Sequence, residues 1–322
     1  MLVAEAPLAG PTAEEVMARA ATENFPVSSW LLPRRARSHL LAVYGFARLV
    51  DELGDGPAPV RLSDEPSEGP GEQSDALGDP AAYGLASAEQ MEDRLVALDW
   101  VEGDLERAYA GRAEHPLLVR LQATLRECAL PREPFVRLIE ANRLDQHVSR
   151  YETWAQLRAY CALSADPVGE LVLGVLGLAT PARIALSNAI CTALQLAEHC
   201  QDVAEDLARG RVYLPAEDLA RFGCSTADLT ATHASAPLRA VLAFEVTRAR
   251  ELLDVGAPLI DELPGARARL AVAAFAAGGR SALAAIERAG YDVLPGPPRA
   301  GKGRRALVLA ATLACRRGRV WP

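Results

Sequence analysis

Apolar side chains recur along most of the chain at the spacing of one helix face. Between residues 117 and 128, leucines and a cysteine return every three or four positions, and Pro116 directly precedes them, as at many helix starts. Similar spacing recurs around residues 171–176, 190–196 and 270–275. Alternating β-branched residues are nearly absent, so the pattern predicts an all-α bundle of about eight to ten helices.

Two segments depart from this pattern. Residues 56–80 contain five Pro, four Gly and six acidic residues against one Arg, which predicts a mobile acidic loop. Residues 299–322 carry seven Lys or Arg and no acidic residue, around an apolar stretch at 306–314. This basic tail is either a last bundle helix with a charged end or a peripheral contact with anionic lipid at the inner face of the cell membrane.

Composition narrows the class of protein. The 322 residues suffice for one large domain with a deep pocket, and the formal charge of −8 opposes binding to nucleic acid. No apolar run reaches the ~18 residues of a membrane span, and no secretory signal pattern opens the chain. The six cysteines are scattered without a C-x-x-C motif, which favours reduced cysteines and a cytoplasmic location.

Two acidic clusters follow apolar helical segments, about 150 residues apart. In each, two aspartates stand at positions i and i+4, which places them on one helix face about 6 Å apart along the axis. Like charges at that spacing repel, and a bridging Mg²⁺ ion would explain them, because Mg²⁺ prefers a few carboxylate oxygens. The alternative is an ordinary solvated helix face. The clusters comprise Asp51, Glu52 and Asp55, and Asp202, Glu205 and Asp206.

The stretches around these clusters resemble the squalene/phytoene synthases, the head-to-head prenyl synthases. Residues 44–55 read YGFARLVDELGD and are similar to the family's first aspartate-rich helix. Residues 195–206 read QLAEHCQDVAED, are followed by GRVYLP, and are similar to the second. Asp145 and the stretch 151–169 resemble the central helix. The resemblance runs over nearly the whole chain, and several motifs in order are more specific than either acidic pair.

Three segments are similar to one branch of the family, the hydroxysqualene synthases of bacterial hopanoid pathways. They read ENFPV at 23–27, ADPVG at 165–169 and EHCQD at 198–202. Phytoene synthases and the enzymes that form presqualene diphosphate typically read N-x-x-R-D at the last of these, so this chain lacks that arginine. The first cluster also has Asp-Glu where the family usually has Asp-Asp, which keeps the charge and alters the geometry.

The resemblance implies a single isoprenoid-synthase-like domain over residues 1–322, in which antiparallel helices surround a deep apolar cavity and the acidic clusters face one another across its mouth. It implies up to about three Mg²⁺ ions and a presqualene diphosphate substrate, supplied by a pathway partner enzyme. Ionisation, rearrangement and water capture would give hydroxysqualene. The expected metal ligands are the six acids of the two clusters, and Asp51, Asp55, Asp202 and Asp206 are also expected to be catalytic.

Other residues are assigned with alternatives. Tyr44 and Tyr160 are expected to flank a carbocation with their aromatic faces, or are ordinary core tyrosines. Arg48 contacts diphosphate or pairs with Asp51, and Gln195 orients water or is a satisfied core residue. His147 and His199 are expected to be structural or surface residues. The expected substrate-binding residues are Phe25, Arg48, Asp145, Gln195, Glu198, Arg211 and Tyr213.

Alternative functions remain open at this point. The chain has no dinucleotide fingerprint and no convincing phosphate loop, so we expect no NADPH. Within the same fold, the protein could instead condense two prenyl diphosphates to presqualene diphosphate, squalene or phytoene. In a different class, it could be a non-catalytic assembly protein that keeps the fold. The survival of both acidic clusters favours an enzyme.

Overall fold

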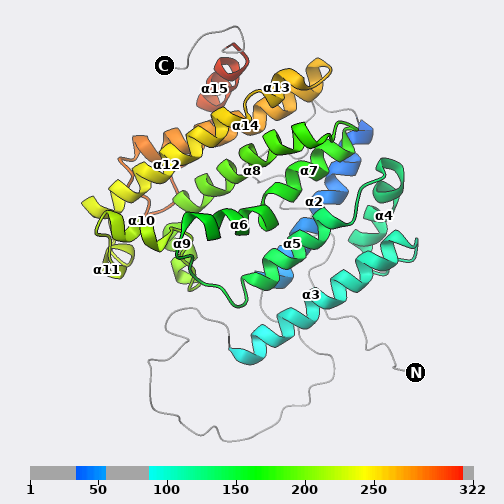
Figure 1. Cartoon of the computed structure of the whole chain (residues 1–322), viewed down its shortest axis with the longest axis horizontal. Helices are drawn as coiled ribbons and strands as arrows, with labels where there is room; N and C mark the ends of the chain where they lie inside the picture. The colour runs from blue at the N-terminus through cyan, green and yellow to red at the C-terminus, as the bar shows by residue number, and fades with distance from the viewer. Residues whose placement is uncertain (1–33, 56–86, 315–322) are drawn as a thin grey trace, which may run out of the picture.

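The computed structural model describes residues 34–55 and 87–314, which form fourteen helices and no sheet (Figure 1). The ten longer helices are α2 (Arg34–Asp55), α3 (Ala88–Tyr109), α4 (Pro116–Cys128), α5 (Glu133–Leu144), α6 (Trp154–Ser164), α7 (Asp166–Val175), α8 (Pro181–Gln201), α12 (Ala236–Gly256), α14 (Ala266–Arg288) and α15 (Lys302–Ala314). The short ones are α9 (Val203–Ala208), α10 (Ala216–Arg221), α11 (Thr226–Leu229) and α13 (Leu259–Glu262).

The all-α prediction is confirmed, and the predicted number of helices is too low. Helices of four to six residues, such as α9 and α11, are too short to show an apolar period. The acidic segment 56–80, Phe25 and residues 315–322 of the basic tail lie outside the described residues.

Local sequence signals explain most helix starts. Side chains of Thr153, Thr180 and Ser235 accept hydrogen bonds from the first turns of α6, α8 and α12. Pro116 occupies the first turn of α4, as its position in the sequence predicts. Local sequence therefore determines where these helices begin, and the apolar faces that they share determine how they pack.

Two apolar cores meet at α7. The first lies among α2, α3, α4 and α5, where the rings of Phe46 and Phe135 pack edge to face with centroids 5.1 Å apart. The second surrounds α8, α12 and α14 (Figure 1). Helix α7 gives Leu171 to the first core and Leu173 to the second. Because α2 belongs to one core and α8 to the other, the acidic clusters at the ends of these helices come from the two halves of the bundle.

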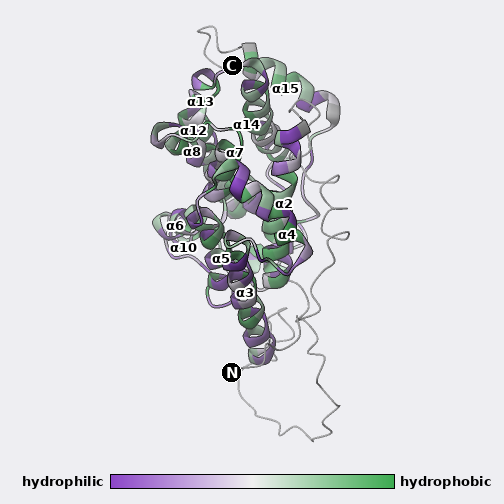
Figure 2. Cartoon of the chain, turned by 90° about the vertical axis from the view of Figure 1, so that its right-hand side faces the viewer, coloured by the Kyte–Doolittle hydropathy of each residue, from purple (hydrophilic) through white to green (hydrophobic). Residues whose placement is uncertain are grey.

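Helix α14 is long and apolar enough to cross a membrane by length and composition, and its ribbon is largely green in Figure 2. However, 56% of its apolar window is buried inside the structure, where it packs against α8, α12 and α15. Among the described helices no other meets the same criteria. This burial is typical of a core helix in a bundle.

Candidate active site

The first acidic cluster lies at the end of α2, where that helix packs against α5. Gly54 allows the approach, because a Cβ atom there would lie 2.2 Å from Oδ1 of Asn142. Asn142 donates a hydrogen bond of 3.3 Å to Oδ1 of Asp51, and Gln146 donates one of 2.9 Å to the carbonyl of Gly54. Helix α5 therefore fixes the end of α2 and orients Asp51.

Two arginines pair with the rest of this cluster. Nη1 of Arg211 lies 2.7 Å from Oδ1 of Asp55, and Nε of Arg48 lies 3.3 Å from Oε1 of Glu52. Arg48 thus pairs with Glu52, four residues on and one turn along the same face, rather than with Asp51. Each carboxylate of the first cluster has a partner within the protein.

Asp51 is accessible at its own surface and at the same time deeply surrounded by protein. This desolvation raises its pKa to about 6, although the hydrogen bond from Asn142 and the charge of Arg48 act in the opposite direction. Asp51 therefore holds a proton more readily than an ordinary aspartate at a protein surface.

Asp145, at the end of α5, connects the first cluster to the aromatic residues. Its carboxylate accepts hydrogen bonds from the hydroxyls of Tyr160 at 2.7 Å and Tyr213 at 3.1 Å, and its carbonyl accepts one from Arg211 at 3.4 Å. Burial raises the pKa of Asp145 to about 6, and Arg211 and the two hydroxyls limit that rise. Asp145 therefore orients Tyr160, Tyr213 and Arg211, which the sequence places far apart.

A short parallel backbone pairing brings two of the tyrosines together. The amide of Val212 donates to the carbonyl of Ser149 at 2.8 Å, and the amide of Ala216 donates to the carbonyl of Tyr151 at 2.9 Å. Tyr151 and Tyr213 therefore stack, with ring centroids 5.9 Å apart and planes 20° apart.

His199 completes this aromatic cluster. Its ring stacks on Tyr213 with centroids 3.9 Å apart, and Tyr160 lies 5.4 Å from Tyr213. Nδ1 of His199 lies 3.8 Å from Oδ2 of Asp206, and Nε2 lies 3.2 Å from Nε2 of Gln195. Of the two expected roles, structural or surface residue, the burial of His199 excludes the second, because its stacking partner Tyr213 and Asp206 cover it from beyond the end of α8.

The second acidic cluster stands at a break between α8 and α9 rather than on one continuous helix. Asp202 ends α8 and precedes α9, with φ −102° and ψ 19°, although the amide of Asp206 still donates to its carbonyl at 2.7 Å. Burial and repulsion from Glu205 and Asp206 raise the pKa of Asp202 to about 6. Within the described residues, the side chains of Asp202 and Glu205 have no hydrogen-bond or ion-pair partner.

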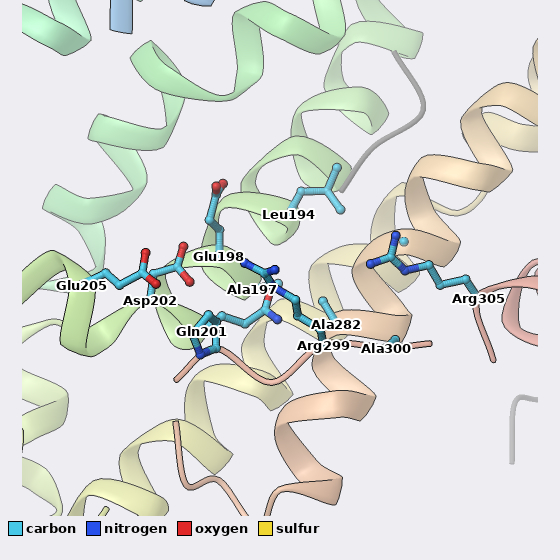
Figure 3. A pocket seen from close by; sticks show the side chains of 12 residues that line it. Leu194, Ala197, Glu198, Gln201, Asp202, Glu205, Ala282, Arg299, Ala300 and Arg305 are labelled. Carbon is cyan, nitrogen blue, oxygen red and sulfur yellow. The ribbon is translucent and has the colours of Figure 1, made fainter. Parts of the chain in front are cut away.

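A pocket of about 680 Å³, part of it open to solvent, lies beside the second cluster. Figure 3 shows Glu198, Asp202 and Glu205 on one side of it and Arg305 on the other, with Arg299 between them. The acids come from the end of α8 and the start of α9, and the arginines come from the chain around the start of α15.

A second pocket, of about 820 Å³, lies beside the first cluster. Its lining includes Asp55, Asp145, Arg94, Arg209 and Arg211. Contacts from Asp55 through Arg211, Asp145, Tyr213 and His199 to Asp206 link the two clusters. A common apolar cavity between them stays a prediction.

The donor chemistry of both clusters fits Mg²⁺. Carboxylate oxygens are the ligands that Mg²⁺ prefers, and water and phosphate oxygens usually complete its shell. In residues 34–55 and 87–314, no three acidic, histidine or cysteine side chains come together as a complete metal site. A Mg²⁺ ion at either cluster would therefore complete its shell with water or with the oxygens of a phosphate group.

The structure brings most of the predicted site residues together. Tyr44 lies half-buried on α2, nearly two turns before Asp51, and Gln195 contacts His199. Sequence reasoning missed five residues, because their partners are distant in the chain or their types carry no motif. These are Asn142, Tyr151, His199, Arg94 and Arg299.

Comparisons with known proteins agree with this arrangement. Residues 18–308 match the family described as squalene/phytoene synthase. The chain is 33% identical to a hydroxysqualene synthase of Rhodopseudomonas palustris, over 79% of this chain and 76% of that protein. It is 31% identical to a phytoene synthase of Arthrospira platensis, over 71% and 68%.

A solved structure is also similar. The crystal structure of squalene synthase HpnC from Alicyclobacillus acidocaldarius is 42% identical, covers 85% of this chain and 92% of its own, and superposes with a TM-score of 0.69. The named activities of these relatives differ, whereas their family is the same. With its helical bundle and its two acidic clusters, the chain belongs to the squalene/phytoene synthase family, whose members are enzymes that act on prenyl diphosphates.

Proposed function

We propose that this protein ionises presqualene diphosphate and captures the rearranged carbocation with water, giving hydroxysqualene. The observation that carries the proposal is the second motif, EHCQD, where Glu198, His199 and Gln201 surround Asp202 in place of the N-x-x-R-D residues. The 33% identity to a hydroxysqualene synthase supports the same branch. A phytoene synthase at 31% identity keeps the product open to experiment.

The residues that would hold Mg²⁺ are Asp51, Glu52 and Asp55, and Asp202, Glu205 and Asp206. The chemistry supplied by bound Mg²⁺ is neutralisation of the charge that develops on the leaving diphosphate. Arg48 and Arg211 would donate charge-assisted hydrogen bonds to phosphate oxygens, because both guanidiniums already lie beside the first cluster. To do so, Arg48 would release Glu52 and Arg211 would release Asp55 when the phosphate group binds.

The aromatic cluster would stabilise the carbocation. Aromatic faces attract positive charge, and Tyr160 and Tyr213 are held by hydrogen bonds to Asp145. Tyr44 would add a further face from α2. Phe25 is proposed as a substrate contact on the resemblance alone.

Water capture needs one ordered water molecule. Gln195 is proposed to orient it through its side-chain amide, next to His199. The water adds to the cation and loses one proton to give the alcohol. This reaction requires no hydride donor, so NADPH is not part of the proposal.

Helix α15 is proposed to touch an anionic membrane surface, from which the C30 substrate arrives. Leu307 is 72% exposed there and Arg304 is also exposed. Anionic lipid attracts each basic residue near the surface by about 1 kcal/mol. Co-sedimentation with anionic and neutral vesicles tests this proposal. Leu307→Asp should reduce binding to the anionic vesicles, and equal binding by both proteins would reject it.

Product analysis tests the reaction. Purified protein should be incubated with presqualene diphosphate and Mg²⁺ in ¹⁸O-labelled water without NADPH, and we expect hydroxysqualene labelled in its hydroxyl group. Farnesyl and geranylgeranyl diphosphates serve as parallel substrates. Squalene that forms only with NADPH, or product only from two fresh diphosphates, would replace the proposal by one of the condensation reactions.

A further inference from the structure

The second motif lacks the arginine that N-x-x-R-D places directly before the aspartate. Gln201 stands there instead, and it is nearly buried. Its side-chain amide donates a hydrogen bond to the carbonyl of Pro298, far along the chain. Gln201 therefore ties residues 297–300, the segment that leads into α15, to the end of α8.

Arg299 directly follows this tie. It lines the same pocket as Asp202 and Glu205, and Figure 3 shows it between the acids of α8 and Arg305. Ala300, the next residue, is buried, which also fixes the segment. The guanidinium of Arg299 thus lies beside the second motif, which contains no arginine of its own.

Three charged side chains of this pocket have no direct partner in the described part of the chain. Arg299 forms no ion pair and no side-chain hydrogen bond within the described residues, and the same holds for Asp202 and Glu205. The remaining space suits a ligand that accepts hydrogen bonds from guanidinium on one side and shares a cation with carboxylates on the other. A diphosphate group has this chemistry, and arginine binds phosphate through two parallel N–H donors.

We propose that Arg299, held in place by Gln201, binds the diphosphate group of the substrate and replaces the arginine missing from the motif. Arg305, in the first turn of α15, adds a second guanidinium on the far side of the pocket. Gln201 lines the pocket as well, but it acts as a positioning residue, since its side-chain amide is engaged with the carbonyl of Pro298. The inference rests on the proposed function only in that the site takes a prenyl diphosphate.

Binding of inorganic diphosphate tests the proposal without turnover. Calorimetric titration of the full chain, with and without Mg²⁺, should show at least about tenfold weaker binding for Arg299→Ala, because a charge-assisted hydrogen bond is lost. Arg299→Lys should have an intermediate affinity for diphosphate, since lysine keeps the positive charge and lacks the two parallel N–H donors of arginine. Arg288→Ala is the matched control, because Arg288 is an exposed arginine at the end of α14 and does not line the pocket.

Two further variants separate binding from positioning. Gln201→Ala should weaken diphosphate binding less than Arg299→Ala and should add little in the double variant, because both changes disable the same guanidinium. Gln201→Arg combined with Arg299→Ala should recover part of the affinity, because it returns a guanidinium to the motif position. Melting curves identify any variant that is simply unfolded.

The outcomes also distinguish this inference from the proposed function. Wild-type diphosphate affinity in both Arg299 variants would overturn the inference, whatever product the enzyme makes. Failure to form hydroxysqualene, together with weakened diphosphate binding in Arg299→Ala, would overturn the proposed product and leave the role of Arg299 standing. With an active substrate, Arg299→Ala should raise KM about tenfold, and Arg288→Ala should leave it unchanged.

Discussion

The two acidic clusters carry the same residue types at the same spacing, and they differ in their surroundings. In the first, Asn142 donates to Asp51, and Arg211 pairs with Asp55. In the second, Asp202 and Glu205 have no such partner in the described part of the chain. All three acids of the first cluster have a partner in the protein, whereas in the second only Asp206 does, with the imidazole of His199 at 3.8 Å.

This difference indicates two roles before substrate arrives. A cation must compete with Arg211 at the first cluster, whereas at the second it relieves repulsion between neighbouring carboxylates. We therefore expect the second cluster to bind a divalent cation more readily in the free protein. The first cluster would gain its cation as phosphate draws Arg211 away from Asp55. Four experiments test this difference between the clusters.

The largest effect is expected from the loss of one carboxylate in either cluster. Asp51→Asn and Asp202→Asn should each lower turnover about a hundredfold or more, since each removes charge that stabilises the departing diphosphate. Their effects on stability should differ. Asp202→Asn relieves repulsion and should maintain or raise Tm in EDTA, whereas Asp51→Asn alters the hydrogen bond with Asn142. Near-wild-type turnover at limiting Mg²⁺ would remove that aspartate from the metal site.

A smaller effect should follow from removing the arginine that neutralises the first cluster. Arg211→Ala leaves Asp55 without its 2.7 Å partner, so the first cluster becomes similar to the second. In an Asp202→Asn background, Mn²⁺ binding measured by calorimetry should tighten by about threefold to tenfold. Arg209→Ala is the control, because Arg209 lines the same pocket and does not pair with Asp55. Unchanged affinity would mean that Arg211 does not compete with the cation.

The pH dependence of stability should reveal both clusters in metal-free protein. The folded-state pKa values of Asp51 and Asp202 are about 6, above the ordinary 3.8, so the folded state retains protons that the unfolded state has released. Their contribution is therefore fully present below pH ~4 and is lost as the pH rises to ~6.

Melting curves in EDTA between pH 4 and 7 check this expectation. The fall in Tm with rising pH should be shallower in Asp202→Asn and in Asp51→Asn than in the wild type. Asp228→Asn is the control, because its hydrogen bonds with Ser225 lower the pKa of Asp228 to about 2, outside this range. Identical slopes in all four proteins would contradict the raised pKa values.

The smallest effect concerns the tyrosines between the clusters. Tyr213→Phe removes the hydrogen bond to Asp145 and keeps the ring, so the free energy of unfolding should fall by about 1 kcal/mol. Tyr151→Phe is the matched control, because the Tyr151 hydroxyl is buried without a hydrogen-bond partner and its loss should be neutral or slightly stabilising. Equal destabilisation in the two variants would mean that Asp145 does not hold Tyr213 in place through this hydrogen bond.

The sequence predicts the clusters and their helices better than it predicts their surroundings. Apolar spacing and Pro116 mark helix faces and starts, because these signals are local. The paired aspartates can be recognised in the sequence because each pair has the i, i+4 spacing of one helical turn. Asn142 and Arg299 carry no such signal, since each matters only through a residue about 90 or more positions away.

The same reasoning explains why the sequence shows neither the surroundings of His199 nor the break within the second cluster. A lone histidine on an apolar helix shows no partner in the sequence, and its ring finds Tyr213 only because residues 212–216 pair with 149–151. A break of one residue at Asp202 leaves the i, i+4 backbone hydrogen bond intact, so the spacing of the acids does not reveal it.

The stack of Tyr151, Tyr160 and Tyr213 makes the centre of the molecule optically distinctive. Three of the seven tyrosines lie within 6 Å of one another, in fixed and unequal orientations. Rings held so closely couple their electronic transitions, and near-ultraviolet circular dichroism reports such fixed packing. A ligand that enters between the two clusters would change this signal without any turnover. The protein therefore carries its own spectroscopic reporter of occupancy, and no label is needed to follow binding in catalytically silent variants.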